Sequence, residues 1–225
     1  MSKTFFVTGT DTDVGKTVAS CGLLAAAAAA GLSTAAVKPV AAGCDENGQN
    51  EDALLLIEAM TQSLAYEQVN PVALRAAIAP HIAAEHEGTR LQVSRLAGLC
   101  RGVMLGRADF VLIEGAGGWR VPLNSRETLA DLARELGAGV ILVVGMRLGC
   151  INHALLSAEA IQRDGLRLAG WVANQPGTPM ACHSENVQTL RHMLRAPLLG
   201  EVPYLSDPTP AAAAQYLDIG PLEVS

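Results

Sequence analysis

Residues 5–17, FFVTGTDTDVGKT, constrain the possible folds more than any other stretch of this 225-residue chain. The apolar run at 5–7 predicts a buried strand, and a polar loop then leads into an alanine- and leucine-rich helical pattern beginning at Lys16. The free N–H groups at a helix N-terminus attract phosphate. Gly15 lets the backbone approach closely, Lys16 adds a charge, and the Thr17 hydroxyl can ligate Mg²⁺ held by a nucleotide. We therefore expect a phosphate-binding loop.

The motif departs from the usual spacing, because five residues rather than four separate Gly9 from Gly15. Two acids, Asp11 and Asp13, also lie inside a loop that must hold a polyanion. The sequence Gly-Lys-Thr is common by itself, so the assignment rests on the strand before it and the helix after it.

Composition narrows the class of protein. Half of the residues are hydrophobic, which is enough for a substantial core in a single domain over residues 1–225. No apolar run approaches the ~18 residues of a membrane span, and the N-terminus leads directly into the first strand without room for a signal peptide. A net charge of −6 argues against a nucleic-acid partner. We expect a cytoplasmic protein that contacts neither membrane nor nucleic acid.

Apolar runs alternate with helical patterns along the chain. The expected strands cover residues 34–37, 110–114, 140–144, 168–174 and 198–202. The expected helices cover residues 17–30, 91–105 and 184–194, with a further helix starting at 50–52. Residues 61–90 receive no assignment, and the tail from Pro208 is rich in proline and alanine. This alternation predicts an α/β fold with a mostly parallel sheet and helices on both faces, similar to the phosphate-loop NTPases.

Charged residues follow two of these strands. Lys38 precedes a proline that ends its strand, and Glu114 closes a fully apolar strand before the glycine-rich stretch 115–118. Ligands of open α/β sheets bind at the carboxyl ends of the strands. The chain has only three lysines among its 16 basic residues, and Lys16 and Lys38 are two of them. We expect both at adjacent strand ends, with Thr17, Asp52 and Glu114 as oxygen ligands for magnesium.

Seven motifs recur in a fixed order between residues 5 and 205. They are GTDTDVGKT, VKPV, Asp52 before a leucine run, EGAGGW, GCINHA, GWVAN and PLLGEVPYL. Each motif is weak alone, but the ordered set resembles the dethiobiotin synthetase family, whose members are ATP-dependent ligases of biotin synthesis. The resemblance implies a homodimer that joins carbon dioxide to diaminopelargonate with ATP and Mg²⁺. One amine forms a carbamate, ATP phosphorylates it, and the second amine closes a cyclic urea with loss of phosphate.

The resemblance also implies residue roles. Lys16 and Lys38 would be catalytic, and Thr17, Asp52 and Glu114 would hold the metal. The implied ATP-binding residues are Asp13, Val14, Gly15, Lys16, Thr17, Val18, Asp52, Glu114, Gly115, Ala116, Gly117, Asn174, Gln175, Pro203, Tyr204 and Leu205. The implied substrate-binding residues are Thr12, Lys38, Ala42, Gly149, Cys150, Ile151 and Asn152, the last four acting across the dimer interface. Ala41 and Ala42 depart from the family, which commonly has a serine just after the lysine-proline turn.

Other functions share parts of this pattern. A dimeric ATP-driven switch of the partitioning type would have the same loop, sheet and magnesium site. Such switches usually carry a further lysine early in the loop, where this chain has Gly9-Thr10-Asp11-Thr12. A cobyrinate-type amidase would need a glutaminase domain for which the chain has no room, and nothing specific favours a plain kinase.

Overall fold

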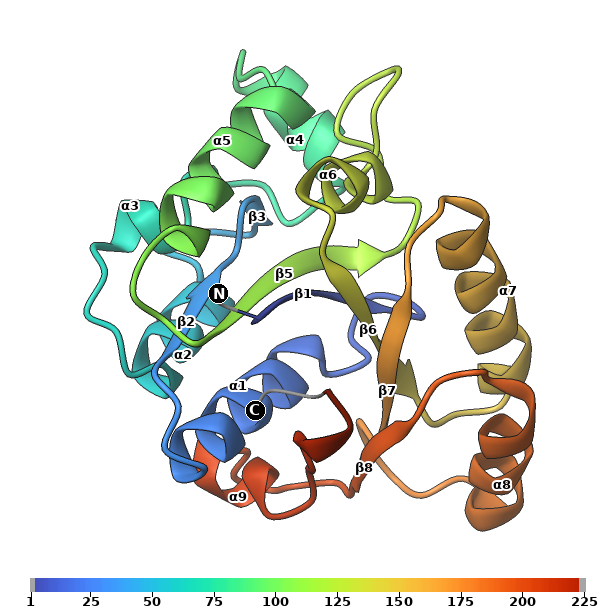
Figure 1. Ribbon diagram of the computed structural model, residues 1–225. Coiled ribbons are helices and arrows are strands. Elements are labelled where there is room, and N and C mark those ends of the chain that lie inside the picture. Colours follow the sequence, from blue (N-terminus) through green and yellow to red (C-terminus); the bar gives the residue numbers. More distant parts are fainter. Residues whose placement is uncertain (1–2, 223–225) are drawn as a thin grey trace.

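A parallel β-sheet forms the centre of the computed structural model, which describes residues 3–222 (Figure 1). Within those residues the sheet has six strands in the order β2-β5-β1-β6-β7-β8, and every neighbouring pair is parallel. Its strands are β1 (Lys3–Gly9), β2 (Thr34–Val37), β5 (Phe110–Gly118), β6 (Gly139–Gly145), β7 (Leu168–Asn174) and β8 (Leu198–Val202). A separate short parallel pair consists of β3 (Ala41–Ala42) and β4 (Ala73–Leu74).

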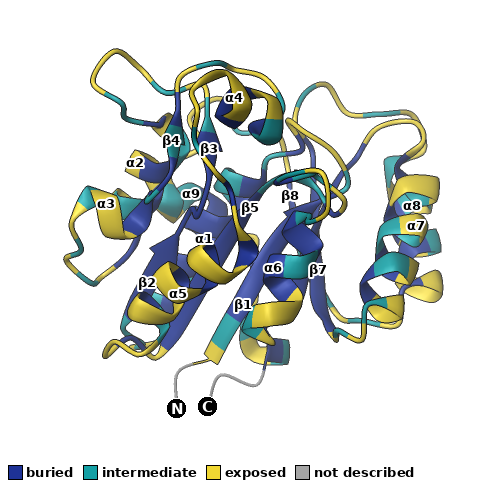
Figure 2. Cartoon of the chain, turned by 90° about the horizontal axis from the view of Figure 1, so that it is seen from above, coloured by how far each residue is buried: buried dark blue, intermediate teal, exposed yellow. Residues whose placement is uncertain are grey.

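The strands are apolar on both faces, which explains why they appear in the sequence as continuous hydrophobic runs. Alternate side chains enter two different cores: Phe6 belongs to one and Phe5 to the other, and both are almost completely buried. Figure 2 shows the strands as buried ribbons beneath partly exposed helices.

Helices cover each face of the sheet, as the alternating pattern predicted. The helices that contribute buried side chains to the core around Phe6 are α4 (Pro80–His86), α5 (Val93–Met104), α6 (Leu129–Leu136), α7 (Cys150–Arg163) and α8 (His183–Met193). The elements that contribute to the core around Phe5 are α1 (Lys16–Ala29), α2 (Glu51–Ala59), α3 (Tyr66–Val69) and the 3₁₀ turn Gly220–Leu222. The last helix, α9 (Pro210–Ala214), packs against α1.

Four details differ from the sequence-based expectations. Helix α6 lies in a stretch for which no element was expected. The glycines after Glu114 continue strand β5 to Gly118 rather than forming a loop. The unassigned stretch 61–90 contains α3, β4 and α4. The prediction that Lys16 and Lys38 follow adjacent strands is wrong, because β5 lies between β1 and β2 and places Glu114 between the two lysines' strands. Within the described residues, no helix has both the length and the apolar character needed to cross a membrane.

The C-terminal part of the described chain packs closely on the helix that follows the phosphate loop. Gly22 of α1 is buried, and a Cβ added there would lie 2.6 Å from Leu217 Cδ1 and 2.9 Å from Ala213 Cβ. The proline- and alanine-rich tail, which had no expected role, therefore covers α1, and glycine at position 22 provides the space for it.

Replacing Gly22 with alanine tests this packing. Alanine normally stabilises a helix interior by about 0.5–1 kcal/mol relative to glycine, but the clash with α9 should cost about 1–3 kcal/mol. We expect Gly22→Ala to lower the free energy of unfolding in urea. Gly98→Ala is the control, because Gly98 lies in α5 with no atom within 4 Å of an added Cβ, and it should raise the same quantity. Equal stabilisation by both changes would contradict the packing of α9 on α1.

Candidate active site

The loop between β1 and α1 can form only with glycine at its two key positions. A Cβ on Gly9 would lie 2.7 Å from Val14 Cγ2 and 2.8 Å from the Asp11 carbonyl oxygen. Gly15 has φ = 80° and precedes α1, and a Cβ there would lie 2.1 Å from Asn174 Nδ2. The Asn174 amide in turn donates a hydrogen bond of 2.8 Å to the Val14 carbonyl oxygen. The end of β7 thus supports the loop and leaves the N-terminus of α1 accessible.

The two acids of the loop have different environments. Asp11 forms an ion pair with Arg147, which follows β6, so an external cation compensates its charge. Asp13 is exposed and has φ = 55°, in the left-handed region that few non-glycine residues adopt. The negative charge of Asp11 therefore does not oppose phosphate binding by the loop, because Arg147 neutralises it.

A cleft of about 880 Å³ opens at the N-terminus of α1. Its polar wall includes the start of α1, Lys38 and Asp52, and its apolar wall includes Leu55 and Ile78. Lys16 is only 8 % exposed, and its Nζ lies 3.4 Å from the Asp11 carbonyl oxygen. Burial lowers the pKa of the Lys16 ammonium, and the attraction of Glu114 does not fully offset this effect.

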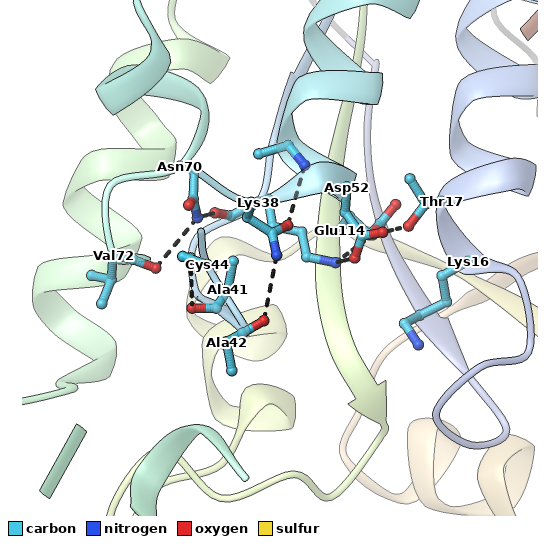
Figure 3. A network of polar contacts seen from close by, with 12 residues as sticks. Lys16, Thr17, Lys38, Ala41, Ala42, Cys44, Asp52, Asn70, Val72 and Glu114 are labelled. Atoms are coloured by element: carbon cyan, nitrogen blue, oxygen red, sulfur yellow. Dashed lines mark hydrogen bonds and ion pairs between the residues drawn. The ribbon is translucent and has the colours of Figure 1, made fainter. Parts of the chain in front are cut away.

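Lys38 occupies the space between two carboxylates (Figure 3). Its Nζ lies 2.6 Å from Asp52 Oδ2 and 2.6 Å from Glu114 Oε1, and the Thr17 hydroxyl donates to the same Glu114 oxygen at 2.9 Å. The Lys38 residue is 4 % exposed and Glu114 is completely buried. Four side chains from α1, α2, β5 and the end of β2 therefore form one polar cluster beside the loop.

The charges in this cluster stabilise one another. Burial alone would lower the pKa of Lys38, but the combined attraction of Glu114 and Asp52 is stronger and raises it. Burial would likewise raise the pKa of Asp52, but the Lys38 ammonium outweighs it and keeps the pKa below its usual range. Lys38 is therefore a fixed cation at neutral pH.

The structure brings most of the predicted residues to the cleft. The predicted residues that line it are Thr12, Asp13, Gly15, Lys16, Thr17, Val18, Lys38, Ala42, Asp52, Ala116 and Gly117. Glu114 contacts this group from below, through Lys38 and Thr17. Val14 and Gly115 have supporting positions, since Val14 is buried and a Cβ on Gly115 would lie 3.1 Å from the Phe6 ring.

Other predicted residues lie outside this cleft. Asn174 and Gln175 are buried, and the Gln175 side chain bonds to the Met146 and Thr178 carbonyl oxygens. Residues 203–205 follow β8, at the edge of the sheet opposite β2, and include the exposed Tyr204. Gly149, with φ = 96°, precedes α7, whose first residues are Cys150, Ile151 and Asn152. Of these three, Cys150 is buried and Asn152 is exposed.

Sequence reasoning missed four polar residues around the site. Arg147 pairs with Asp11, while Asn50, Tyr66 and Asn70 form hydrogen bonds around the Lys38 backbone and the start of α2. Asn50 could have been identified as the N-cap that its position before Glu51 and Asp52 suggests. Tyr66 and Asn70 carry no local signal, because they lie in the stretch that received no assignment.

Lys38 should stabilise the fold as well as serve the site. Replacing it with methionine leaves the buried Glu114 and the partly exposed Asp52 without their cation, which should cost about 3 kcal/mol at neutral pH. In the native protein the lowered pKa of Asp52 stabilises the fold above the unfolded-state pKa of about 3.9, and this contribution disappears as the pH falls through the lower folded-state value. Lys38→Met should therefore show a smaller loss of stability on acidification. Urea titrations between pH 2.5 and 8 measure this, and parallel curves would contradict the pairing.

Comparisons with known proteins identify the family. The family model described as an AAA domain matches residues 3–212. The chain is 59 % identical to the ATP-dependent dethiobiotin synthetase of Pseudomonas paraeruginosa, covering 98 % of both sequences, and 49 % identical to that of Escherichia coli O157:H7, covering 97 % and 99 %. Among solved structures, the septum site-determining protein MinD of Pyrococcus horikoshii, complexed with Mg-ADP, matches with a TM-score of 0.60. It is 15 % identical, with 100 % and 94 % of the two chains covered, so the likeness concerns the fold alone. The high identity over nearly the whole sequence shows that this chain belongs to the dethiobiotin synthetase family.

Proposed function

We propose that this protein uses ATP to convert diaminopelargonate and carbon dioxide into dethiobiotin, ADP and phosphate. Family membership supports the reaction, and the observation that carries it is the pair of buried ammonium groups, Lys16 and Lys38, in one cleft. Each reaction step creates or moves negative charge on oxygen, so fixed cations in a site of restricted solvent access would stabilise its transition states.

The nucleotide phosphates would bind at the N-terminus of α1. This helix has 14 residues and an open N-terminus preceded by the left-handed Gly15, so its free N–H groups can receive phosphate oxygens. Lys16 supplies a cation next to them. Burial lowers the pKa of the Lys16 ammonium. A phosphate bound beside it would have the opposite effect and favour the charged form of the side chain.

The carboxylate cluster is suited to Mg²⁺. Glu114 Oε2 is buried and has no hydrogen-bond partner among residues 3–222, although buried oxygens usually have one. Thr17 and Asp52 add oxygen atoms of the kind that Mg²⁺ prefers, and nucleotide phosphates commonly complete such sites. We infer that Thr17, Asp52 and Glu114 hold the ion. When bound, it would neutralise charge on the phosphoryl group that is transferred.

Lys38 would act on the carbamate side of the reaction. The first amine adds to carbon dioxide and loses a proton, which gives a carbamate. A carbamate oxygen then attacks the terminal phosphorus of ATP, and ADP leaves. The second amine attacks the carbamate carbon, the C–O bond to phosphate breaks, and the cyclic urea forms with loss of a proton. Lys38 is held charged and oriented by Asp52 and Glu114, so it can bind the oxygens that carry charge in these steps.

The apolar wall fits the hydrocarbon chain of diaminopelargonate. Ala42, Leu55 and Ile78 line the same cleft as Lys38, and a buried alkyl chain gains about 0.8 kcal/mol per methylene. Ala42 offers no hydroxyl to the substrate, and its carbonyl oxygen accepts a hydrogen bond from Asn50. The contact that a serine hydroxyl would make with the substrate's nitrogen or carbamate would therefore fall to the main chain or to water.

In a homodimer the start of α7 could bind substrate held by the partner subunit. Gly149 to Asn152 do not line the cleft of their own chain, and the neighbouring Leu148 is 95 % exposed. The helix has 14 residues, and its N-terminal N–H groups suit a carboxylate. We propose that this turn receives the substrate carboxylate of the partner subunit.

Substitution of the two lysines tests the proposed chemistry. Lys16→Ala should lose nucleotide binding in calorimetry and reduce turnover by ~10²–10³-fold, because one charge on the transferred group is missing. Lys38→Ala should reduce turnover by ~10²-fold while ADP affinity stays close to that of the native protein. Turnover is dethiobiotin formed from ATP, Mg²⁺, bicarbonate and diaminopelargonate, measured by mass spectrometry, with circular dichroism confirming the fold. Native protein that forms no dethiobiotin would refute the proposed function, and full activity of Lys38→Ala would refute the role of Lys38.

Complementation between inactive chains tests the shared site. A Lys38→Ala chain and a chain disabled by Asn152→Trp are each expected to be nearly inactive alone. Mixing them should restore one working site per heterodimer, giving about a quarter of the native activity after full subunit exchange, if each site uses Lys38 of one subunit and Asn152 of the other. Mass spectrometry of the intact complexes verifies exchange. Heterodimers without recovered activity would place both residues in a site within one chain.

A further inference from the structure

A ring of hydrogen bonds connects the backbone of Lys38 to the carboxylate that binds its side chain. The Lys38 carbonyl oxygen accepts from Asn70 Nδ2 at 2.7 Å, and Asn70 Oδ1 accepts from the Tyr66 hydroxyl at 3.0 Å. The same hydroxyl accepts from the Asn50 backbone N–H at 2.7 Å. Asn50 caps α2, whose second residue, Asp52, bonds to Lys38 Nζ and closes the ring.

The ring of hydrogen bonds lies at the end of the edge strand β2, where the backbone needs partners from outside the sheet. Among the described strands, β2 lies at an edge of the sheet and pairs only with β5, so the sheet leaves the outer side of the β2 terminus without a partner strand. The C-terminal end of α3 provides the missing contacts. Val69 accepts from the Lys38 N–H at 2.7 Å, and Asn70, which is 3 % exposed, binds the Lys38 carbonyl oxygen.

Asn50 extends the ring to the wall of the cleft. Its Oδ1 accepts from the Ala53 N–H at 3.3 Å, and its Nδ2 donates to the Ala42 carbonyl oxygen at 3.4 Å. The start of α2 is thereby fixed to the turn that follows Lys38. Any movement of α2 would change the position of Asp52 relative to Lys38 and of Ala42 relative to the substrate.

We propose that Tyr66, Asn70 and Asn50 are positioning residues that fix the Lys38 ammonium against the carbamate. This role rests on the proposed function. Tyr66 and Asn70 do not line the cleft, and Asn50, which does, uses its side chain to bond to Ala42 and Ala53, so the three residues act through Lys38 and Asp52. The Tyr66 hydroxyl is the central connection, because it joins the α3 side of the ring to the α2 side.

Tyr66→Phe removes the hydroxyl that makes this connection and retains the aromatic side chain. We expect kcat to fall about 10-fold, since small displacements of a catalytic group are costly, while ADP affinity stays unchanged. Gln68→Ala is the matched control. It removes a different side-chain hydrogen bond from the same short helix, the 2.9 Å contact of Gln68 Oε1 with the Ala65 N–H, and should leave kcat within about 2-fold of native.

A double-mutant cycle separates positioning from a general loss of stability. If Tyr66 acts through Lys38, adding Tyr66→Phe to Lys38→Ala should lower turnover no further, because the group being positioned is absent. If Tyr66 had a merely structural role, the fold losses of turnover from the two substitutions would multiply in the double variant. Native-like kcat in Tyr66→Phe, a matching loss in Gln68→Ala, or multiplied effects in the cycle would each overturn the proposal. Absence of dethiobiotin with the native protein would instead refute the proposed function.

Discussion

The contact of one buried ammonium with two carboxylates determines how this site is built. Lys38 and Glu114 would each be costly to bury alone, and the partly exposed Asp52 adds a second carboxylate beside the ammonium. Their mutual neutralisation allows the residue after β2, the middle of β5 and the start of α2 to meet in one cluster. The same arrangement gives the cleft a cation of fixed position next to oxygen atoms suited to Mg²⁺. Stability and proposed catalysis therefore depend on the same three side chains.

The conformation of the phosphate loop depends on residues that are distant from it in sequence. Gly15 at the start of α1 and Asn174 at the end of β7 fit together, and the Asn174 amide supports the loop through Val14. Arg147, after β6, compensates Asp11. The loop conformation is thus set by the carboxyl ends of neighbouring strands as well as by its own sequence.

The sequence alone predicted the parallel sheet, the helices on both faces and the cluster of Lys16, Thr17, Lys38 and Glu114. These features depend on local patterns: buried strands are apolar runs, and the residues that follow them lie at one edge of the sheet. The strand order could not be obtained in this way, so the insertion of β5 between β1 and β2 was missed. Tyr66 and Asn70 were also missed, because their role arises from tertiary contacts with Lys38 and Asn50 rather than from a sequence pattern. The dimer and the roles of individual residues in catalysis, in nucleotide and metal binding and in substrate binding remain predictions.

The packing of α9 on α1 has a consequence for how the protein forms during synthesis. Helix α1 leaves the ribosome early, whereas Ala213 and Leu217, which cover its Gly22, are translated only after all six described strands of the sheet. Until then the apolar side of α1 is incompletely covered, and such transiently exposed surfaces favour aggregation. A polypeptide that ends before Ala213 would therefore lack the side chains that cover Gly22 of α1.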